Sequence, residues 1–236
     1  MIRVQPAPEP RAFDTEVRRP GRMAISEMIG EAPDPPRRSG RPFKQRTRTV
    51  RQTDGTERKE PIRRAEDLPA SEFPTYWQEA LPDLKNAFRE VCAYSCFRIH
   101  PVTGAASVDH MAPKSRHWDQ VYEWSNYRLC CSKLNARKRD FTGVLDPFDI
   151  DEDGAPWFQL EWTAFQIRPN PKLPKDVRNR IQDTIELLDL NDPTFLRDRE
   201  QDVVDYLAGD VSLKILERES SFIARELRRQ GRLRSP

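Results

Sequence analysis

VDHMAPKSRHWDQVYEWSNYRLCCSKLNARKRD, residues 108–140, concentrates the polar residues of the chain that suit catalysis. It places Asp109 beside His110, then Asn126, then Asn135 and Lys138. A carboxylate and an amide oxygen are hard ligands for a divalent cation such as Mg²⁺ or Mn²⁺. A histidine is largely neutral near pH 7, so it can take a proton from water. These residue types suit phosphodiester hydrolysis with one metal ion.

The local patterns around these residues predict strand, turn, strand, loop and helix. Residues 96–100 and 106–110 have the pattern of strands, with a turn at 101–104 between them. Residues 128–139 contain no Gly or Pro and predict a short helix, with Asn135 and Lys138 on one face. Asp109 and His110 would then point to opposite sides of the second strand.

The segment resembles the HNH (His-Me finger, ββα-metal) endonuclease family, with asparagines nine residues apart after Val-Asp-His. That start is also similar to the HNH domain of RNA-guided CRISPR effector nucleases. The wider chain resembles the HNH proteins of retron and Septu-type bacterial anti-phage defence systems, over about residues 70–230. The motifs that carry this likeness are Cys-Ala-Tyr (92–94), Asp-His-x-x-Pro-Lys-Ser (109–115), Trp-x-Asn-Tyr-Arg-Leu (124–129), Thr-Ile-x-Leu-Leu-x-Leu-Asn (184–191) and Glu-Ser-Ser-Phe (219–222).

This resemblance implies a role for each polar residue. Asp109 and Asn135 would hold one Mg²⁺ or Mn²⁺ ion, and His110 would be the general base. Asn126 would brace the loop that carries the histidine, which is also what an ordinary turn asparagine does. The activity implied is a metal-dependent endonuclease that cuts DNA, as the effector of an anti-phage system.

Basic residues cluster around the proposed ligands in sequence. Basic side chains at a phosphodiester site position phosphates and offset developing negative charge. We therefore predict phosphate contacts for Lys114, Arg128 and Lys138, with Lys138 the strongest candidate, one helical turn beyond Asn135. For the other basic residues nearby, a solvated helix face is at least as good an interpretation.

The four cysteines do not follow the spacing of a zinc site. Relatives hold a structural zinc with two Cys-x-x-Cys pairs, which here would need cysteines where Ser95 and Leu134 stand. Cys130 and Cys131 are adjacent, and neighbouring side chains on a helix diverge. We expect no structural zinc and interpret the cysteines as small buried side chains, with a rearranged metal site as the alternative.

The composition predicts that part of the chain is not packed. Of 236 residues 36% are hydrophobic and 33% charged, and ten of the 21 prolines fall in residues 1–70. We expect an extended or disordered arm over 1–70, the nuclease core over 71–145, and a β-hairpin with a helical region over 146–236. Residues 37–64 hold eleven Lys/Arg against three Asp/Glu. They predict a basic arm along a nucleic-acid backbone; a solvated linker and a segment ordered only by a partner protein are the alternatives.

The remaining patterns predict an α+β fold. A helix is expected from about residue 74 to 91, with Ser71 or Thr75 as its cap, bent at Pro82 and packed on the hairpin. Strands are expected at 144–148 and 157–165, joined by an acidic turn at 149–154. Three helices should follow, at about 174–189, 193–208 and 211–230, as a scaffold or a docking surface.

The sequence also limits partners and location. It contains no apolar run of membrane-spanning length and no hydrophobic segment of a signal peptide, so we expect a cytoplasmic protein without membrane contact. It lacks the Gly-x-x-x-x-Gly-Lys-Ser/Thr motif, and the resemblance implies a separate P-loop ATPase partner. Two other functions stay open: an RNase or tRNA-cleaving toxin, and an inactive nucleic-acid-binding or regulatory subunit.

Overall fold

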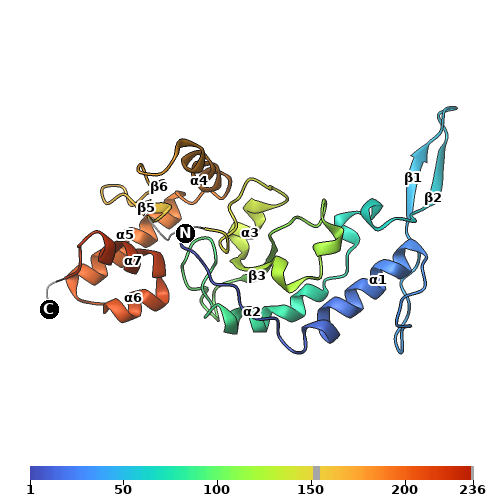
Figure 1. Ribbon diagram of the computed structural model, residues 1–236, viewed down its shortest axis with the longest axis horizontal. Helices are drawn as coiled ribbons and strands as arrows, with labels where there is room; N and C mark the ends of the chain where they lie inside the picture. The colour runs from blue at the N-terminus through green and yellow to red at the C-terminus, as the bar shows by residue number, and fades with distance from the viewer. Residues whose placement is uncertain (151–154, 235–236) are drawn as a thin grey trace.

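The computed structural model describes residues 1–150 and 155–234, and they form a mixed α+β chain of small sheets and short helices. Figure 1 shows the β1–β2 hairpin at one end, α5, α6 and α7 at the other, and β3 and α3 between them. The elements are η1 Asp14–Arg18, α1 Arg19–Ile29, β1 Thr47–Arg51, β2 Glu57–Pro61, η2 Ala65–Asp67, η3 Ala70–Glu72, η4 Tyr76–Ala80, α2 Leu81–Ala87, β3 Ala106–His110, η5 Trp118–Gln120, η6 Trp124–Asn126, β4 Tyr127–Cys131, α3 Ser132–Lys138, β5 Phe158–Leu160, β6 Ile167–Pro169, α4 Lys175–Leu187, α5 Pro193–Ala208, α6 Leu213–Glu219 and α7 Ser221–Arg229.

At the centre, two strands and a helix follow one another. β3 pairs antiparallel with β4, with Asp109 opposite Arg128 and His110 opposite Tyr127, and α3 starts directly after β4. The predicted helix at 128–139 is therefore wrong in its first turn, because residues 127–130 are all buried and pair with β3 as a strand. A short apolar run fits a buried strand as well as a helix, so periodicity could not separate the two.

The segment before β3 differs from the prediction. Residues 96–100 form no strand, because Cys96 has a φ of +61° and the segment makes only two isolated bridges, Arg98 with Val91 and Phe97 with Ser220. The helix expected from about 74 to 91 begins as the 3-10 turn η4 and continues directly as α2, which starts at Leu81 with Pro82 in its first turn and ends at Ala87. Proline fits that position because the first N–H groups of a helix have no partner within the helix.

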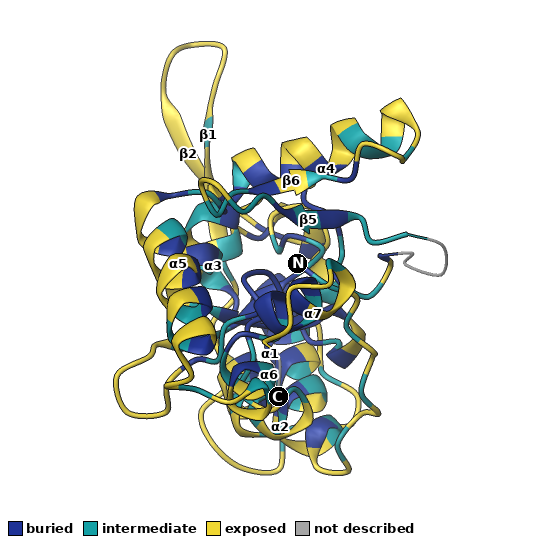
Figure 2. Cartoon of the chain, turned by 90° about the vertical axis from the view of Figure 1, so that its left-hand side faces the viewer, coloured by how far each residue is buried: buried dark blue, intermediate teal, exposed yellow. Residues whose placement is uncertain are grey.

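The N-terminal 70 residues are ordered, so the prediction of an extended or disordered arm is wrong for most of them. Phe13 and Val17 are buried, and the Phe13 ring meets Trp124 edge-on at 5.6 Å. Ala24 and Met28 on α1 are fully buried. These apolar residues recur at helical spacing and supply the burial that the proline content alone did not suggest. The β1–β2 hairpin remains exposed, as the burial colours of Figure 2 show.

The C-terminal region forms one hairpin and four helices within the described residues. The hairpin pairs β5 with β6, while 144–148 is not a strand and residues 151–154 of the predicted acidic turn lie outside the described part. The predictions of α4 and α5 are close to the observed bounds, but the helix expected at 211–230 is divided at Ser220, whose φ is −145°. None of the described helices is long and apolar enough to cross a membrane.

Candidate active site around the end of strand β3

His110 is buried, and a carbonyl group fixes its tautomer. Only 7% of its surface is exposed, and its Nε2 lies 3.0 Å from the Val121 carbonyl oxygen. Because a carbonyl can only accept, Nε2 carries the proton and Nδ1 keeps its lone pair. The rings of Trp77 and Tyr127 stand edge-on to the imidazole, at 5.0 and 5.2 Å between centroids. The imidazole is thus held in one orientation, with Nδ1 available to take a proton.

The surroundings of His110 favour its neutral form. Burial, with the nearby positive charges of Lys114 and Lys138, lowers its pKa from 6.5 to about 3. The imidazole is therefore neutral over the whole physiological range. Lys114 lies above the Trp77 ring, with its Nζ 4.0 Å from the ring centroid, so the same indole contacts both residues. Of the three predicted phosphate contacts, Lys114 is the one whose ammonium group has no carboxylate partner among the described residues.

Asp109 lies on the other side of β3 and is 2% exposed. Its Oδ2 accepts a hydrogen bond from the Tyr94 hydroxyl at 2.5 Å, and its Oδ1 is 3.1 Å from Lys138 Nζ. Burial raises the pKa of Asp109, and the Lys138 charge and the Tyr94 hydrogen bond oppose that rise. Tyr94 was not among the predicted site residues; its place in the Cys-Ala-Tyr motif was the available signal.

Lys138 is not placed for a phosphate contact. It is fully buried, and besides Asp109 it donates a hydrogen bond to the His110 carbonyl oxygen at 2.7 Å. Its ammonium group therefore links helix α3 to the end of β3. This departs from the predicted role, because a buried and paired ammonium cannot reach a substrate without breaking a buried ion pair.

Arg128 departs from its predicted role in the same way. It is 3% exposed, its Nε donates to Asp146 Oδ1 at 2.7 Å, and its guanidinium lies 3.5 Å from the centre of the Phe148 ring. The pair joins β4 to the loop that follows α3. Asp146 is distant in sequence and had no motif of its own, so the pairing could not be read from the chain.

Asn126 closes the loop that follows His110. Its Oδ1 accepts from the Ala112 N–H at 2.6 Å, and its Nδ2 donates to the Ala112 and Gln120 carbonyls at 3.1 and 2.9 Å. One side chain thereby joins two separate points of the loop that contains Val121, the residue that orients His110. Its bonds are those that a bracing residue makes.

Asn135 extends from α3 toward β3, on the same helix face as Lys138. Its Nδ2 donates to Ser107 Oγ at 3.1 Å and to the Val108 carbonyl at 3.2 Å. Its Oδ1 has no hydrogen bond to another described residue, and each Asp109 oxygen keeps a lone pair beyond its present partner. The donor types on the facing elements thus fit a hard divalent cation, which would share Asp109 with Lys138.

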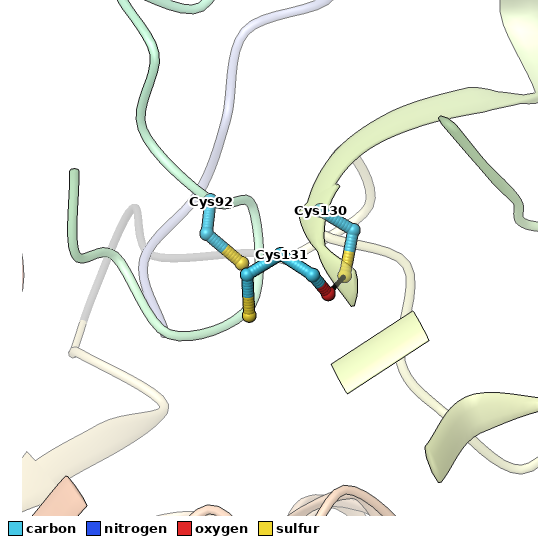
Figure 3. A group of neighbouring side chains, drawn as sticks. All are labelled: Cys92, Cys130 and Cys131. Carbon is cyan, nitrogen blue, oxygen red and sulfur yellow. Dashed lines mark hydrogen bonds between the residues drawn. The ribbon is translucent and has the colours of Figure 1, made fainter. Parts of the chain in front are cut away.

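Three cysteines meet on the far side of β4. The Sγ atoms of Cys92, Cys130 and Cys131 lie within 4.8 Å of one another. Figure 3 shows the three side chains side by side. Cys130 and Cys131 belong to a strand and not to a helix, and although neighbouring strand side chains point to opposite faces, the sulfur of Cys131, the last residue of β4, lies close to the other two. Burial opposes a thiolate at Cys92, but hydrogen bonds from the other two thiols outweigh it and lower its pKa. Such a group could hold a thiophilic metal ion with three ligands.

Comparison with known proteins adds no assignment: no protein-family model matches the chain, and no curated protein matches it.

Proposed function

We propose that the chain is a metal-dependent HNH-type endonuclease that hydrolyses phosphodiester bonds of DNA, as the effector of an anti-phage defence system. The observation that carries this proposal is the state of His110, which is neutral, fixed through Nε2 and free at Nδ1. Asp109 directly precedes it on β3, with its side chain on the opposite face, and Asn135 reaches β3 from the following helix. A base at the end of a strand with hard ligands nearby is what one-metal phosphodiester hydrolysis requires.

In the proposed reaction, His110 Nδ1 takes a proton from the water that attacks phosphorus. The Val121 carbonyl and the two aromatic rings keep the imidazole in place during this transfer. Lys114, above Trp77, would contact a non-bridging phosphate oxygen near the base. Asp109 and Asn135 would hold Mg²⁺ or Mn²⁺, which supplies charge neutralisation at the scissile phosphate when bound.

A cleavage assay tests the proposal. The purified chain is given plasmid, linear duplex, single-stranded DNA and RNA, with Mg²⁺, Mn²⁺ or a chelator. We expect metal-dependent cutting of DNA that falls about 10²–10⁴-fold in His110→Ala, because that is the usual contribution of a general base. His117→Ala is the matched control, since His117 is exposed and its ring makes no contact with the site. Cutting of RNA alone would favour the toxin alternative, and no cutting with any metal would favour an inactive subunit.

We also propose a separate P-loop ATPase partner in the cytoplasm. The sequence has no P-loop of its own, and a freely active nuclease would endanger the host chromosome. Val204 and Leu207, about half exposed on α5, are candidate contacts for that partner. Full activity of the chain alone, with no ATPase recovered in pull-downs from its native host, would contradict this part of the proposal.

A further inference from the structure

The positive charge of the chain is concentrated in one segment. Residues 37–64 carry a net charge of +8, while the whole chain carries +2, so the rest of the molecule is net negative by six charges. The segment includes the β1–β2 hairpin and both of its ends, and the hairpin stands away from the body in Figures 1 and 2. Of this charge the hairpin itself, residues 47–61, carries a net +1 from four basic and three acidic residues, and the flanking residues 37–46 and 62–64 carry the other +7.

The hairpin buries no apolar face of its own. Of the residues in its two strands, only Val50 and Glu60 are half-buried, and the others are exposed. Its turn is closed by Asp54 and Gly55, whose φ of +84° favours glycine. A two-stranded ribbon without a buried face is marginally stable in water, so burial of apolar surface does not explain the presence of this ribbon. Its side chains are presented outward on both faces.

Most of the cations in the segment have no partner. Arg37, Arg46, Arg48 and Arg64 form ion pairs, with Glu27, Glu72, Asp67 and Glu66 respectively. Within the described chain, ion pairs are lacking for Arg38, Arg41, Lys44, Arg51, Arg58, Lys59 and Arg63.

The ribbon's own carboxylates leave two of these cations uncompensated. Glu57 and Glu60 stand opposite Arg51 and Arg48 in the strand register. Asp54 is occupied by Thr56 in the turn. Arg58 and Lys59 face Val50 and Thr49, and as neighbours on a strand they point to opposite faces.

We propose that the β1–β2 ribbon binds the DNA duplex that the nuclease site cuts, with Arg58 and Lys59 on its phosphates. Two strands about 4.8 Å apart fit the major groove of B-form DNA, roughly 12 Å wide. The deep, narrow major groove of A-form RNA does not admit such a ribbon. Phosphate contacts carry no sequence information, so the ribbon holds any duplex sequence. This inference rests on the proposed function, because it names the substrate form of that site.

A binding assay separates this inference from catalysis. In a His110→Ala background without divalent metal, which suppresses cutting, Arg58→Ala/Lys59→Ala is titrated with a labelled DNA duplex across about 50–200 mM salt. We expect Kd to rise about 10-fold at 0.1 M salt and the salt slope to flatten by about two, one for each phosphate that is no longer neutralised. The matched control is Lys172→Ala/Lys175→Ala, which removes the same charge from exposed lysines near the start of α4 and should bind like the parent.

Each result then has one meaning. Equal binding by the two double variants would overturn the inference, as would equally tight ribbon-dependent binding of duplex RNA. Capture of an acidic protein with no binding of nucleic acid would overturn it too. If the parent chain binds DNA through the ribbon but never cuts it, the inference stands and the proposed function is wrong. If the parent chain cuts DNA and the ribbon substitutions do not change that cutting, the proposed function stands and the inference is wrong. A circular-dichroism melt establishes that both variants are folded.

Discussion

The site at the end of β3 and the β1–β2 ribbon use basic side chains in opposite ways. In the site, Lys138 and Arg128 are buried, and each lies against a carboxylate. On the ribbon, Arg58 and Lys59 are exposed and have no such partner. An unpaired charge costs several kcal/mol to bury, so a cation inside the protein must meet an anion there. Closeness to the proposed catalytic residues in sequence therefore says less about phosphate binding than exposure does.

Lys138→Met removes the buried ion pair with Asp109 and should have the largest effect on stability. The change leaves Asp109 buried beside Tyr94 with no positive partner, so we expect the free energy of unfolding to fall by about 3–5 kcal/mol. Urea denaturation without divalent metal measures it. The control is Lys133→Met on the same helix, because Lys133 is 42% exposed and its partner Asp192 also pairs with Arg137. That change should cost less than about 1 kcal/mol.

Two further measurements identify the cause of that loss. Adding Asp109→Asn to Lys138→Met removes the orphaned charge and should restore part of the stability, whereas a simple packing defect would not be rescued. If Mg²⁺ shares Asp109 with Lys138, it should also raise the Tm of the Lys138→Met variant more than that of the parent. An equal rise in the two proteins would place the ion elsewhere.

Asn126→Ala should have the next largest effect. It removes the acceptor of the Ala112 N–H and the donor to two loop carbonyls, which costs about 1–3 kcal/mol when the groups left behind stay buried. Hydrogen exchange should show lower protection at the Ala112 amide. Asn179→Ala, at an exposed position of α4, is the matched control. Loss of metal binding with unchanged stability would contradict the bracing role.

The part of the site built from local sequence could be predicted, and the part built from distant pairs could not. Asp109 and His110 do end a strand, and Asn135 and Lys138 do share a helix face toward it. These features follow from strand and helix periods over a few residues. Tyr94 reaches Asp109 through the fold, and although it stands in the Cys-Ala-Tyr motif, nothing in that motif indicates that its hydroxyl meets a carboxylate fifteen positions later.

The N-terminal order was missed for the same reason. Its stabilising contacts are distant: Arg18 hydrogen-bonds Glu123, 105 positions later, and Phe13 packs on Trp124. A high proline content lowers the expectation of a packed segment, but it does not count the apolar residues that a distant surface can cover. The helix at 128–139 failed on a different point, since Tyr127 to Cys130 is a buried run that periodicity cannot assign.

The third prediction concerns the group formed by Cys92, Cys130 and Cys131, which is buried but contains no ion pair. We expect less than one zinc per chain in protein purified without chelator, because the sequence supplies no fourth thiolate at Ser95. Cys92→Ala with Cys131→Ala should then stay folded at a cost of about 2 kcal/mol, as small buried side chains do. Cys96→Ala, outside the group, is the control. Stoichiometric zinc that is lost with unfolding in the double variant would make the group of Figure 3 a metal site.

The smallest effect is expected where an acidic side chain is partly buried without a cation. Burial raises the pKa of Asp202 from 3.8 to about 6, and repulsion from Asp198, Asp205 and Glu219 adds to the rise. The Ser220 hydroxyl donates to its carboxylate and opposes the shift. Because the folded state holds the proton more tightly, the stabilising contribution is complete below pH 3.8 and is lost as the pH rises through 6.

Asp202→Asn should therefore stabilise the protein at pH 8 and not at pH 4. Above pH 6 the parent carries a desolvated carboxylate that the amide lacks, while the amide oxygen can still accept from Ser220. We expect a gain of about 1–2 kcal/mol at pH 8, reduced from the full linkage value because the side chain is partly exposed. Thermal melts from pH 4 to 8 measure it, with Asp210→Asn at an exposed position as the control. An equal effect at both pH values would assign the change to packing and remove the charge explanation.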